Sequence, residues 1–409
     1  MGARLLKPRH PGAGAVLLLA WALGLACPNP SPADGGRRKS PEEQRLEYVI
    51  EAAYRQCFKT YWIAGQPLTL RIPFAENGER DFTQSIFLGG KGDPGELWAQ
   101  VDALLDSDQF LEYITALEQP GEKVIEYDLE SGSYSVYFDP VLAELMAQGS
   151  YPGTSSLVYV LKSDCEITEV EVYNYLYCLG SLGLDCSGFV YYIQKSIAEA
   201  YAFDLDEALA ESWRTAVAGV PQIAGIWLFN PRSGYAEQVE DTIESLRPGD
   251  VFLFMGREHT YRHSAVIQSI DTTGGLIRYL QCTDWAPQQE RGAHASQILF
   301  DPAAPALRLS HPGVRWLQQV RPTFIGEPGL EYWRNDGDRY RAYRKEGGSL
   351  IVRLSLIREL LESVEPGFYA CYDGAGEVSR CNPTGSDVRP ALPALPETGL
   401  PSPGLQRPR

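Results

Sequence analysis

The sequence is poor in positive charge and in cysteine. Its 36 lysine and arginine residues face 53 aspartate and glutamate residues, which gives a formal net charge of −17. A chain with this charge has no overall electrostatic attraction for nucleic acid, so we expect no nucleic-acid partner. Eight cysteines in 409 residues are also too few for a small scaffold held together by disulfides.

Several common functional signatures are missing as well. The sequence contains no internal repeat, no glycine-rich phosphate-binding loop and no dinucleotide-binding motif. Its cysteines have no metal-ligand spacing with the five histidines, so we predict no metal site and no cofactor. Hydrophobic residues make up 44% and charged residues 22%, which excludes a wholly disordered or collagen-like chain.

One long apolar run is present, near the N-terminus. Residues 13–26 are rich in alanine, glycine and leucine, and they follow a basic stretch. The run is shorter than the about 20 residues that cross a bilayer, but it has the length of a signal-peptide core. We therefore predict a signal peptide over residues 1–26 and export to the cell envelope. Cys27 follows directly, at the position where a bacterial lipoprotein is lipidated, so a membrane tether through Cys27 and plain secretion are both open.

The remaining chain divides by composition and periodicity. Residues 27–45, rich in proline and glycine, indicate a flexible linker, and residues 382–409 indicate a disordered tail. Helical and strand periodicities predict an N-terminal α+β domain of unknown role over residues 46–165. No motif in that domain carries recognisable chemistry.

The second half of the chain holds the candidate site. We place this site in a domain over residues 166–325, followed by a C-terminal extension over residues 326–381. Within the extension, residues 350–354 have the apolar character of a strand and residues 357–364 have helical periodicity.

The candidate chemistry starts at Cys186. Asp185 is a good N-cap for the helical pattern that follows, so the Cys186 thiol would sit in the first turn of a helix. The positive end of the helix dipole and the backbone N–H groups of that turn favour the thiolate over the thiol. Such a position is typical of a nucleophile, although cysteine also occurs in helices as an ordinary core residue.

Two later segments supply a partner for this thiol. Residues 248–250, Pro-Gly-Asp, form a turn before an apolar strand, and His263 opens the alternating strand that follows. A histidine held in this way could form a thiolate–imidazolium pair and later protonate the leaving amine. Gln281, on the next strand, would fix the orientation of the imidazole. The alternatives for that orienting role are Cys282, Asp284 and His294.

These blocks, in this order, resemble the NlpC (p-sixty) family of cysteine peptidases. The family has Asp-Cys-Ser-Gly at a helix start, then a Gly-Asp strand and a strand opened by histidine. The resemblance implies a papain-like α+β fold, in which the helix bearing the cysteine packs on an antiparallel sheet. It carries over Cys186 as the nucleophile, His263 as the base and Gln281 as the third polar residue. The residues placed at the substrate and the oxyanion are Tyr175, Asp185 and Ser187.

The chain departs from the family pattern in two places. The family's Tyr-x-Trp-Gly-Gly motif is replaced by Tyr-Leu-Tyr-Cys-Leu-Gly over residues 175–180. Seventy-six residues separate Cys186 from His263, which implies an insertion around residues 213–240.

The function that the resemblance implies is an exported endopeptidase. The family cleaves amide bonds in peptidoglycan stem peptides, commonly at D-glutamyl-diamino acid linkages, so peptidoglycan or a muropeptide is the expected substrate. Two alternatives stay open. One is a papain-like amidase or acyltransferase that acts on a substrate outside the wall, and the other is a non-catalytic binding protein of the envelope.

Overall fold

The computed structural model describes most of the chain between residues 39 and 381. The described ranges are 39–74, 94–128, 133–148, 157–162, 166–176, 183–217, 220, 224–255, 261–283, 292–304, 306–321, 332–335, 349–363, 369–372 and 378–381. The predicted signal peptide, Cys27, Asp284 and the predicted tail over residues 382–409 lie outside them. The described part is α+β, as predicted.

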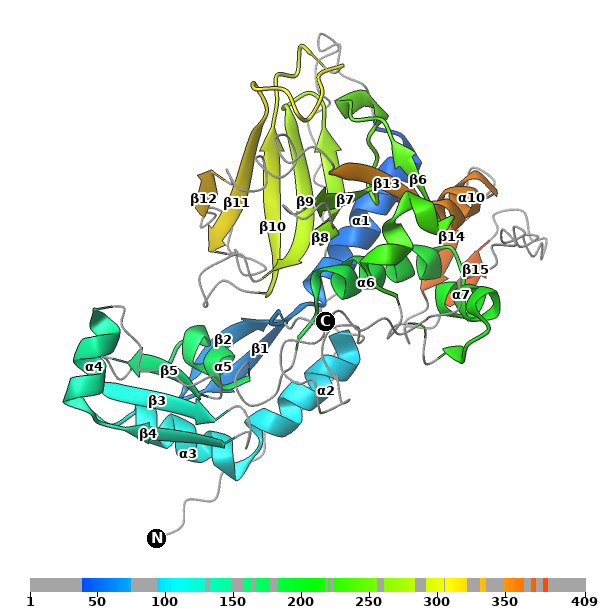
Figure 1. The fold of residues 1–409 in the computed structure, drawn as a ribbon. Helices are drawn as coiled ribbons and strands as arrows, with labels where there is room; N and C mark the ends of the chain where they lie inside the picture. Colours follow the sequence, from blue (N-terminus) through cyan, green and yellow to red (C-terminus); the bar gives the residue numbers. More distant parts are fainter. Residues whose placement is uncertain are drawn as a thin grey trace, which may run out of the picture.

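An eight-stranded antiparallel sheet forms the centre of the described structure (Figure 1). Its strand order is β12-β11-β10-β9-β8-β7-β13-β6. The strands are β6 (Ala236–Val239), β7 (Val251–Met255), β8 (Tyr261–Asp271), β9 (Leu276–Thr283), β10 (Gly292–Leu299), β11 (Arg315–Arg321), β12 (Tyr332–Asn335) and β13 (Leu350–Leu354). Consecutive strands from β7 to β12 are neighbours, so this part of the sheet is built from successive antiparallel connections.

Strand β13 changes the predicted division of the chain. Its residues Ile351 and Val352 pair with Phe252 and Val251 of β7, and its other edge pairs with β6. The strand and the helix after it, α10 (Ser355–Ser363), confirm the elements predicted there. The boundary predicted at residue 325 does not divide the structure, however, because β12 and β13 complete the sheet.

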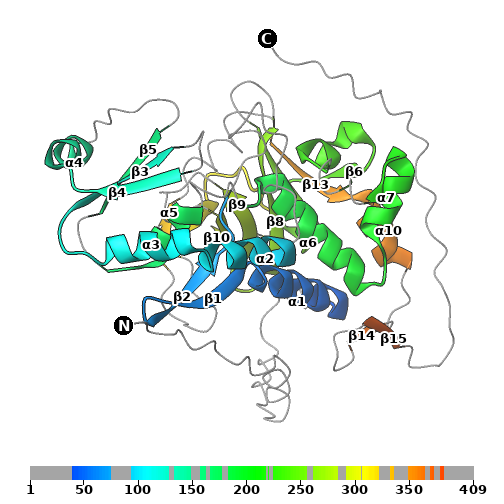
Figure 2. The ribbon, with the colours of Figure 1, turned by 90° about the horizontal axis from the view of Figure 1, so that it is seen from below.

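The two faces of the sheet have different coverings. Helices α1 (Pro41–Arg55) and α6 (Cys186–Ala200) pack together on one face, and α10 packs against α6 (Figures 1 and 2). Strand residues that point toward these helices, such as Leu253, Val266 and Leu280, share one core with them. The alternate strand residues form a second core on the opposite face, where Phe252, Phe254, Tyr279 and Trp316 meet.

Helix α1 belongs with the large sheet. Ser40 and Glu43 form a capping box at its start, which satisfies backbone N–H groups of the first turn. Farther along, Glu51 forms an ion pair with Arg278 of β9, and Arg45 donates a 2.8 Å hydrogen bond to the carbonyl oxygen of Ala200. The predicted linker therefore ends before α1, and this helix does not belong to the domain predicted over residues 46–165.

A smaller α+β unit lies beside the large sheet (Figure 1). Its three-stranded antiparallel sheet has the order β4-β3-β5. Its elements are α2 (Pro94–Leu105), α3 (Asp108–Leu117), β3 (Lys123–Asp128), β4 (Ser133–Tyr137), α4 (Pro140–Ala147), β5 (Leu157–Lys162) and α5 (Glu169–Tyr175). The hairpin of β1 (Phe58–Ile63) and β2 (Gln66–Arg71) lies between this unit and the large sheet.

The remaining described elements are short. They are α7 (Leu205–Trp213), η3 (Ile226–Phe229), η4 (Pro231–Ser233), η5 (Ile243–Ser245), β14 (Tyr369–Tyr372) and β15 (Val378–Cys381). The insertion predicted around residues 213–240 contains η3, η4 and the edge strand β6. Across the described ranges, we find no helix with both the length and the apolar character needed to cross a bilayer.

Candidate active site

Cys186 is the first residue of helix α6, and Asp185 caps that helix as predicted. The Asp185 carboxylate accepts hydrogen bonds from the Gly188 backbone N–H and from the Ser187 hydroxyl, the latter at 3.0 Å. Asp185 and Ser187 are buried, whereas Cys186 is partly exposed. The two buried side chains thus fix the start of the helix and place the thiol at the positive end of its dipole.

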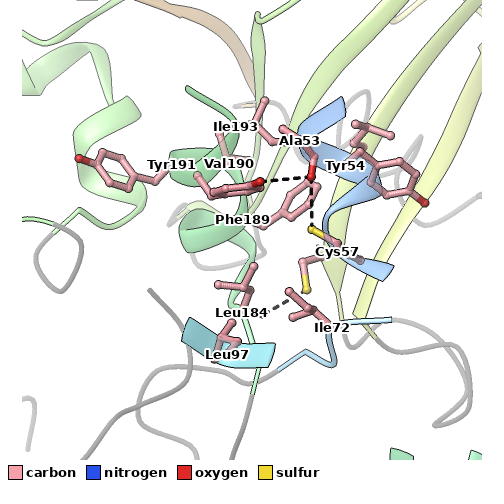
Figure 3. Close-up of a cluster of buried hydrophobic side chains, with 14 of the residues drawn as sticks. Ala53, Tyr54, Cys57, Ile72, Leu97, Leu184, Phe189, Val190, Tyr191 and Ile193 are labelled. Carbon is pink, nitrogen blue, oxygen red and sulfur yellow. Dashed lines mark hydrogen bonds between the residues drawn. The ribbon is translucent and has the colours of Figure 1, made fainter. Parts of the chain in front are cut away.

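Two chain segments hold the helix start in place. The Leu184 backbone N–H donates a 3.0 Å hydrogen bond to the Pro73 carbonyl oxygen, in the extended segment after β2. The thiol of Cys282 on β9 donates to the Leu184 carbonyl oxygen at 3.1 Å. Figure 3 shows Leu184 beside Ile72 and Cys57 in the core below α6. Cys186, the candidate nucleophile, therefore lies two residues after Leu184, whose backbone N–H and carbonyl oxygen are both hydrogen-bonded to other segments.

His263 and Gln281 meet on the sheet. The His263 Nε2 atom lies 2.9 Å from Oε1 of Gln281, and both side chains are buried. The Gln281 Nε2 atom donates a 2.8 Å hydrogen bond to the hydroxyl of Ser296 on β10. Because the amide nitrogen is directed to Ser296, the amide oxygen faces the imidazole and accepts the proton of Nε2. Nδ1 is then the basic nitrogen of the neutral His263 ring.

The predicted contact between His263 and Gln281 is thus confirmed. Ser296, which the sequence analysis did not single out, is a third member of this hydrogen-bonded group. A serine in a strand gives no signal of its own in the sequence. It becomes informative only through the register of β9 and β10, which places Ser296 on the same face as Gln281. Ser296 holds the amide in the orientation that the imidazole needs.

The other candidates for the orienting role are placed differently. His294 pairs with Gln281 across the β9–β10 ladder, and its Nδ1 atom lies 2.8 Å from the Gly292 carbonyl oxygen. Cys282 points to the opposite face, toward Leu184, and burial raises the pKa of its thiol. Cys282 therefore cannot orient His263, whereas His294 lies beside Gln281 on the face that carries the imidazole.

The sheet itself lies between the two halves of the predicted catalytic pair. The His263 ring packs on Phe254, with centroids 5.7 Å apart, on the face away from α6. Helix α6 begins above the opposite face, near Cys282, which lies close to the end of β9. His263 lies near the start of β8, at the same end of the sheet. A contact between Cys186 and His263 would therefore have to form around this end of the sheet. The pairing of Cys186 with His263 stays a prediction.

Tyr175 lies in the core of the smaller unit. Its ring centroid is 4.9 Å from that of Phe110 and 5.2 Å from that of Tyr113, both on α3. The Tyr175 hydroxyl lies 3.2 Å from the hydroxyl of Ser107, and burial raises the pKa of the phenol. These contacts join α5 to α3. They do not support the predicted role of Tyr175 at the substrate or the oxyanion.

The Gly-Asp part of the motif has a structural role. Asp250 is completely buried and accepts hydrogen bonds of 2.7 and 2.8 Å from Nε and Nη2 of Arg353 on β13. It also accepts a 2.8 Å hydrogen bond from the Arg247 backbone N–H. Gly249 has φ of +91°, which favours glycine at this turn. The turn therefore ties the start of β7 to β13.

The described residues contain no cluster of three or more histidine, cysteine or acidic side chains arranged to hold a metal. The chain was also compared with known proteins. No protein-family model, no curated protein and no solved structure matches it. The motif and the geometry are therefore what support a functional proposal.

Proposed function

We propose that the chain is an exported cysteine peptidase that cleaves amide bonds in peptidoglycan stem peptides. The observation that carries the proposal is a partly exposed thiol at the start of a capped helix, next to the sheet end where Gln281 orients His263. The helix start favours the thiolate of Cys186, and the orientation of His263 leaves Nδ1 as the basic nitrogen. Nucleophile, base and orienting group are the three roles that this chemistry requires.

The reaction would proceed in two steps. The Cys186 thiolate attacks the carbonyl carbon, and backbone N–H groups of the first turn of α6 stabilise the oxyanion that forms. The tetrahedral intermediate collapses as protonated His263 gives its proton to the leaving amine, which leaves a thioester on Cys186. Neutral His263 then takes a proton from water as the water oxygen attacks the thioester, and the carboxylic acid product departs, which restores the Cys186 thiolate and protonated His263.

The substrate class rests on the resemblance of the motif. Asp-Cys-Ser-Gly over residues 185–188, the Gly-Asp turn and the strand opened by His263 resemble the NlpC (p-sixty) pattern, whose substrates are stem peptides. The arrangement of α6 on an antiparallel sheet agrees with the fold which that pattern implies. The predicted signal peptide would deliver the enzyme to the compartment that holds this substrate.

Digestion of purified peptidoglycan tests the proposal. Wild-type protein should release muropeptide fragments with a new free amino group on the diamino acid, detected by mass spectrometry. Cys186→Ala should release none, whereas Cys57→Ala, which removes a fully buried thiol, should release the same fragments. No fragments from folded wild-type protein would overturn the substrate assignment. Equal release by wild type and Cys186→Ala would overturn the nucleophile.

A further inference from the structure

Two cysteines lie fully buried in the core below helix α6. Cys57 comes two residues after the end of α1, and Cys282 lies on β9. Both side chains belong to the core that α1, α6 and the large sheet share. Among the cysteines whose side chains the structure describes, the remaining one is the partly exposed Cys186. The buried pair has no part in the proposed reaction, so its presence in this core needs a separate explanation.

Backbone hydrogen bonds bring the segments of the two buried cysteines together. The Ile72 N–H donates a 2.8 Å hydrogen bond to the Cys57 carbonyl oxygen, and the Ile72 carbonyl oxygen accepts a 3.2 Å hydrogen bond from the Ala293 N–H. Ala293 lies directly opposite Cys282 in the antiparallel ladder of β9 and β10. Figure 3 shows Cys57 beside Ile72 in this part of the core. Ile72 therefore connects the backbone of Cys57 to the strand next to Cys282.

The two thiol groups also interact electrostatically. Burial raises the pKa of the Cys282 thiol. Neighbouring groups that can carry a negative charge raise this pKa further, and among them Cys57 has the largest effect, ahead of Cys186. This order agrees with the backbone connections, and it favours Cys57 over Cys186 as the partner of Cys282.

We propose that Cys57 and Cys282 form a disulfide bond when the protein is exported. An oxidising compartment favours such bonds, whereas a reducing one keeps thiols free. As the S–S bond forms, the two thiols lose two protons and two electrons, and the disulfide of a thiol oxidoreductase accepts both and becomes a dithiol. The bond forms while the chain folds, before the core closes around the pair. The Cys282 side chain then turns from the Leu184 carbonyl oxygen toward Cys57 and gives up its 3.1 Å hydrogen bond.

The bond would join segments that lie far apart in the sequence. It ties the connection between α1 and β1 to the large sheet, beneath the segment that leads into α6. A disulfide that closes a long loop restricts the unfolded chain, so the oxidised protein should be more stable than the reduced protein. Cys186 is not part of the bond, so its thiol stays available for catalysis. The proposal depends on export and not on peptidase activity.

Peptide mapping tests the bond directly. The full chain is recovered from the bacterial periplasm, after secretion behind a periplasmic signal peptide, and is also made in the cytosol. Each sample is denatured in iodoacetamide, which blocks free thiols, and is then digested for mass spectrometry. We expect a Cys57–Cys282 linked peptide from the periplasmic protein and two alkylated cysteines from the cytosolic protein. Alkylated Cys57 and Cys282 in folded periplasmic protein, or a link between Cys282 and Cys186, would overturn the proposal.

Thermal unfolding with and without a reductant gives a second test. Reduced wild-type protein should unfold several degrees below the oxidised protein. Cys186→Ala keeps both proposed partners and should show the same difference, whereas Cys57→Ala and Cys282→Ala should lose most of it. Each variant is compared only with itself, so the cost of a smaller side chain in the core does not enter the comparison. A difference as large as that of wild type in folded Cys57→Ala would assign the bond to other cysteines and overturn the proposal.

Discussion

The imidazole Nε2 atom of His263 lies 2.9 Å from the amide oxygen of Gln281, on the face of the sheet that points away from helix α6. This contact links two neighbouring strands and determines which ring nitrogen carries the proton. A neutral amide orients the imidazole but does not offset the charge of an imidazolium as a carboxylate would. Thiolate formation at Cys186 then depends more strongly on the helix start.

Replacement of Gln281 should slow turnover without abolishing it. We expect Gln281→Ala to lower kcat/KM by tens to hundreds of fold, about 2–3 kcal/mol at about 1.36 kcal/mol per decade. The nucleophile survives this change, so Cys186→Ala should cost far more. The measurement is the rate of muropeptide release by each variant. A silent Gln281→Ala together with an inactive His294→Ala would move the orienting role to His294.

Replacement of Ser296 should act through the tautomer of His263. Without the Ser296 hydroxyl, the Gln281 amide loses the group that fixes its orientation, and rotation would present its nitrogen to the imidazole. We expect wild-type protein to hold the Nε2–H tautomer and Ser296→Ala to show a mixture, as measured by the ¹⁵N shifts of the His263 ring. Ser296→Thr, which keeps the hydroxyl, serves as the control. An unchanged tautomer in Ser296→Ala would show that Ser296 does not fix the tautomer of His263.

Removal of the Tyr175 hydroxyl should affect stability and not catalysis. Tyr175→Phe loses one hydrogen bond within the smaller unit, so we expect a loss of about 1 kcal/mol in unfolding free energy and unchanged kcat/KM. Urea denaturation and the digestion assay measure the two quantities. A fall of about tenfold in kcat/KM with unchanged stability would restore Tyr175 to the site.

Removal of one partner of the ion pair between Asp250 and Arg353 should lower the free energy of unfolding. Arg353→Met leaves a buried carboxylate without its guanidinium, which we expect to cost about 3–5 kcal/mol in unfolding free energy. Asp250→Leu combined with Arg353→Met removes both charges and should regain much of that loss. Denaturant unfolding of the single and double variants measures the difference. A double variant that is less stable than Arg353→Met would contradict this role.

The sequence predicted local features well because their causes are local. Asp185 caps helix α6 because its short carboxylate accepts a hydrogen bond from a backbone N–H of the first turn. The apolar residues 350–354 favour a strand whichever neighbours that strand has. Which strands become neighbours is set by packing between distant segments, so the insertion of β13 beside β7 could not be predicted. The order of the motifs predicted that Tyr175 lies at the substrate, but its ring packs against Phe110 and Tyr113 of α3.

The pH dependence of Cys186 alkylation shows whether Cys186 and His263 form a thiolate–imidazolium pair at the end of the sheet. Iodoacetamide should then modify wild-type Cys186 rapidly below about pH 7, where a free thiol is almost fully protonated. His263→Ala should lose this acid limb and react only as the pH approaches the range of a free thiol. Identical profiles for folded wild-type and His263→Ala protein would contradict the pair.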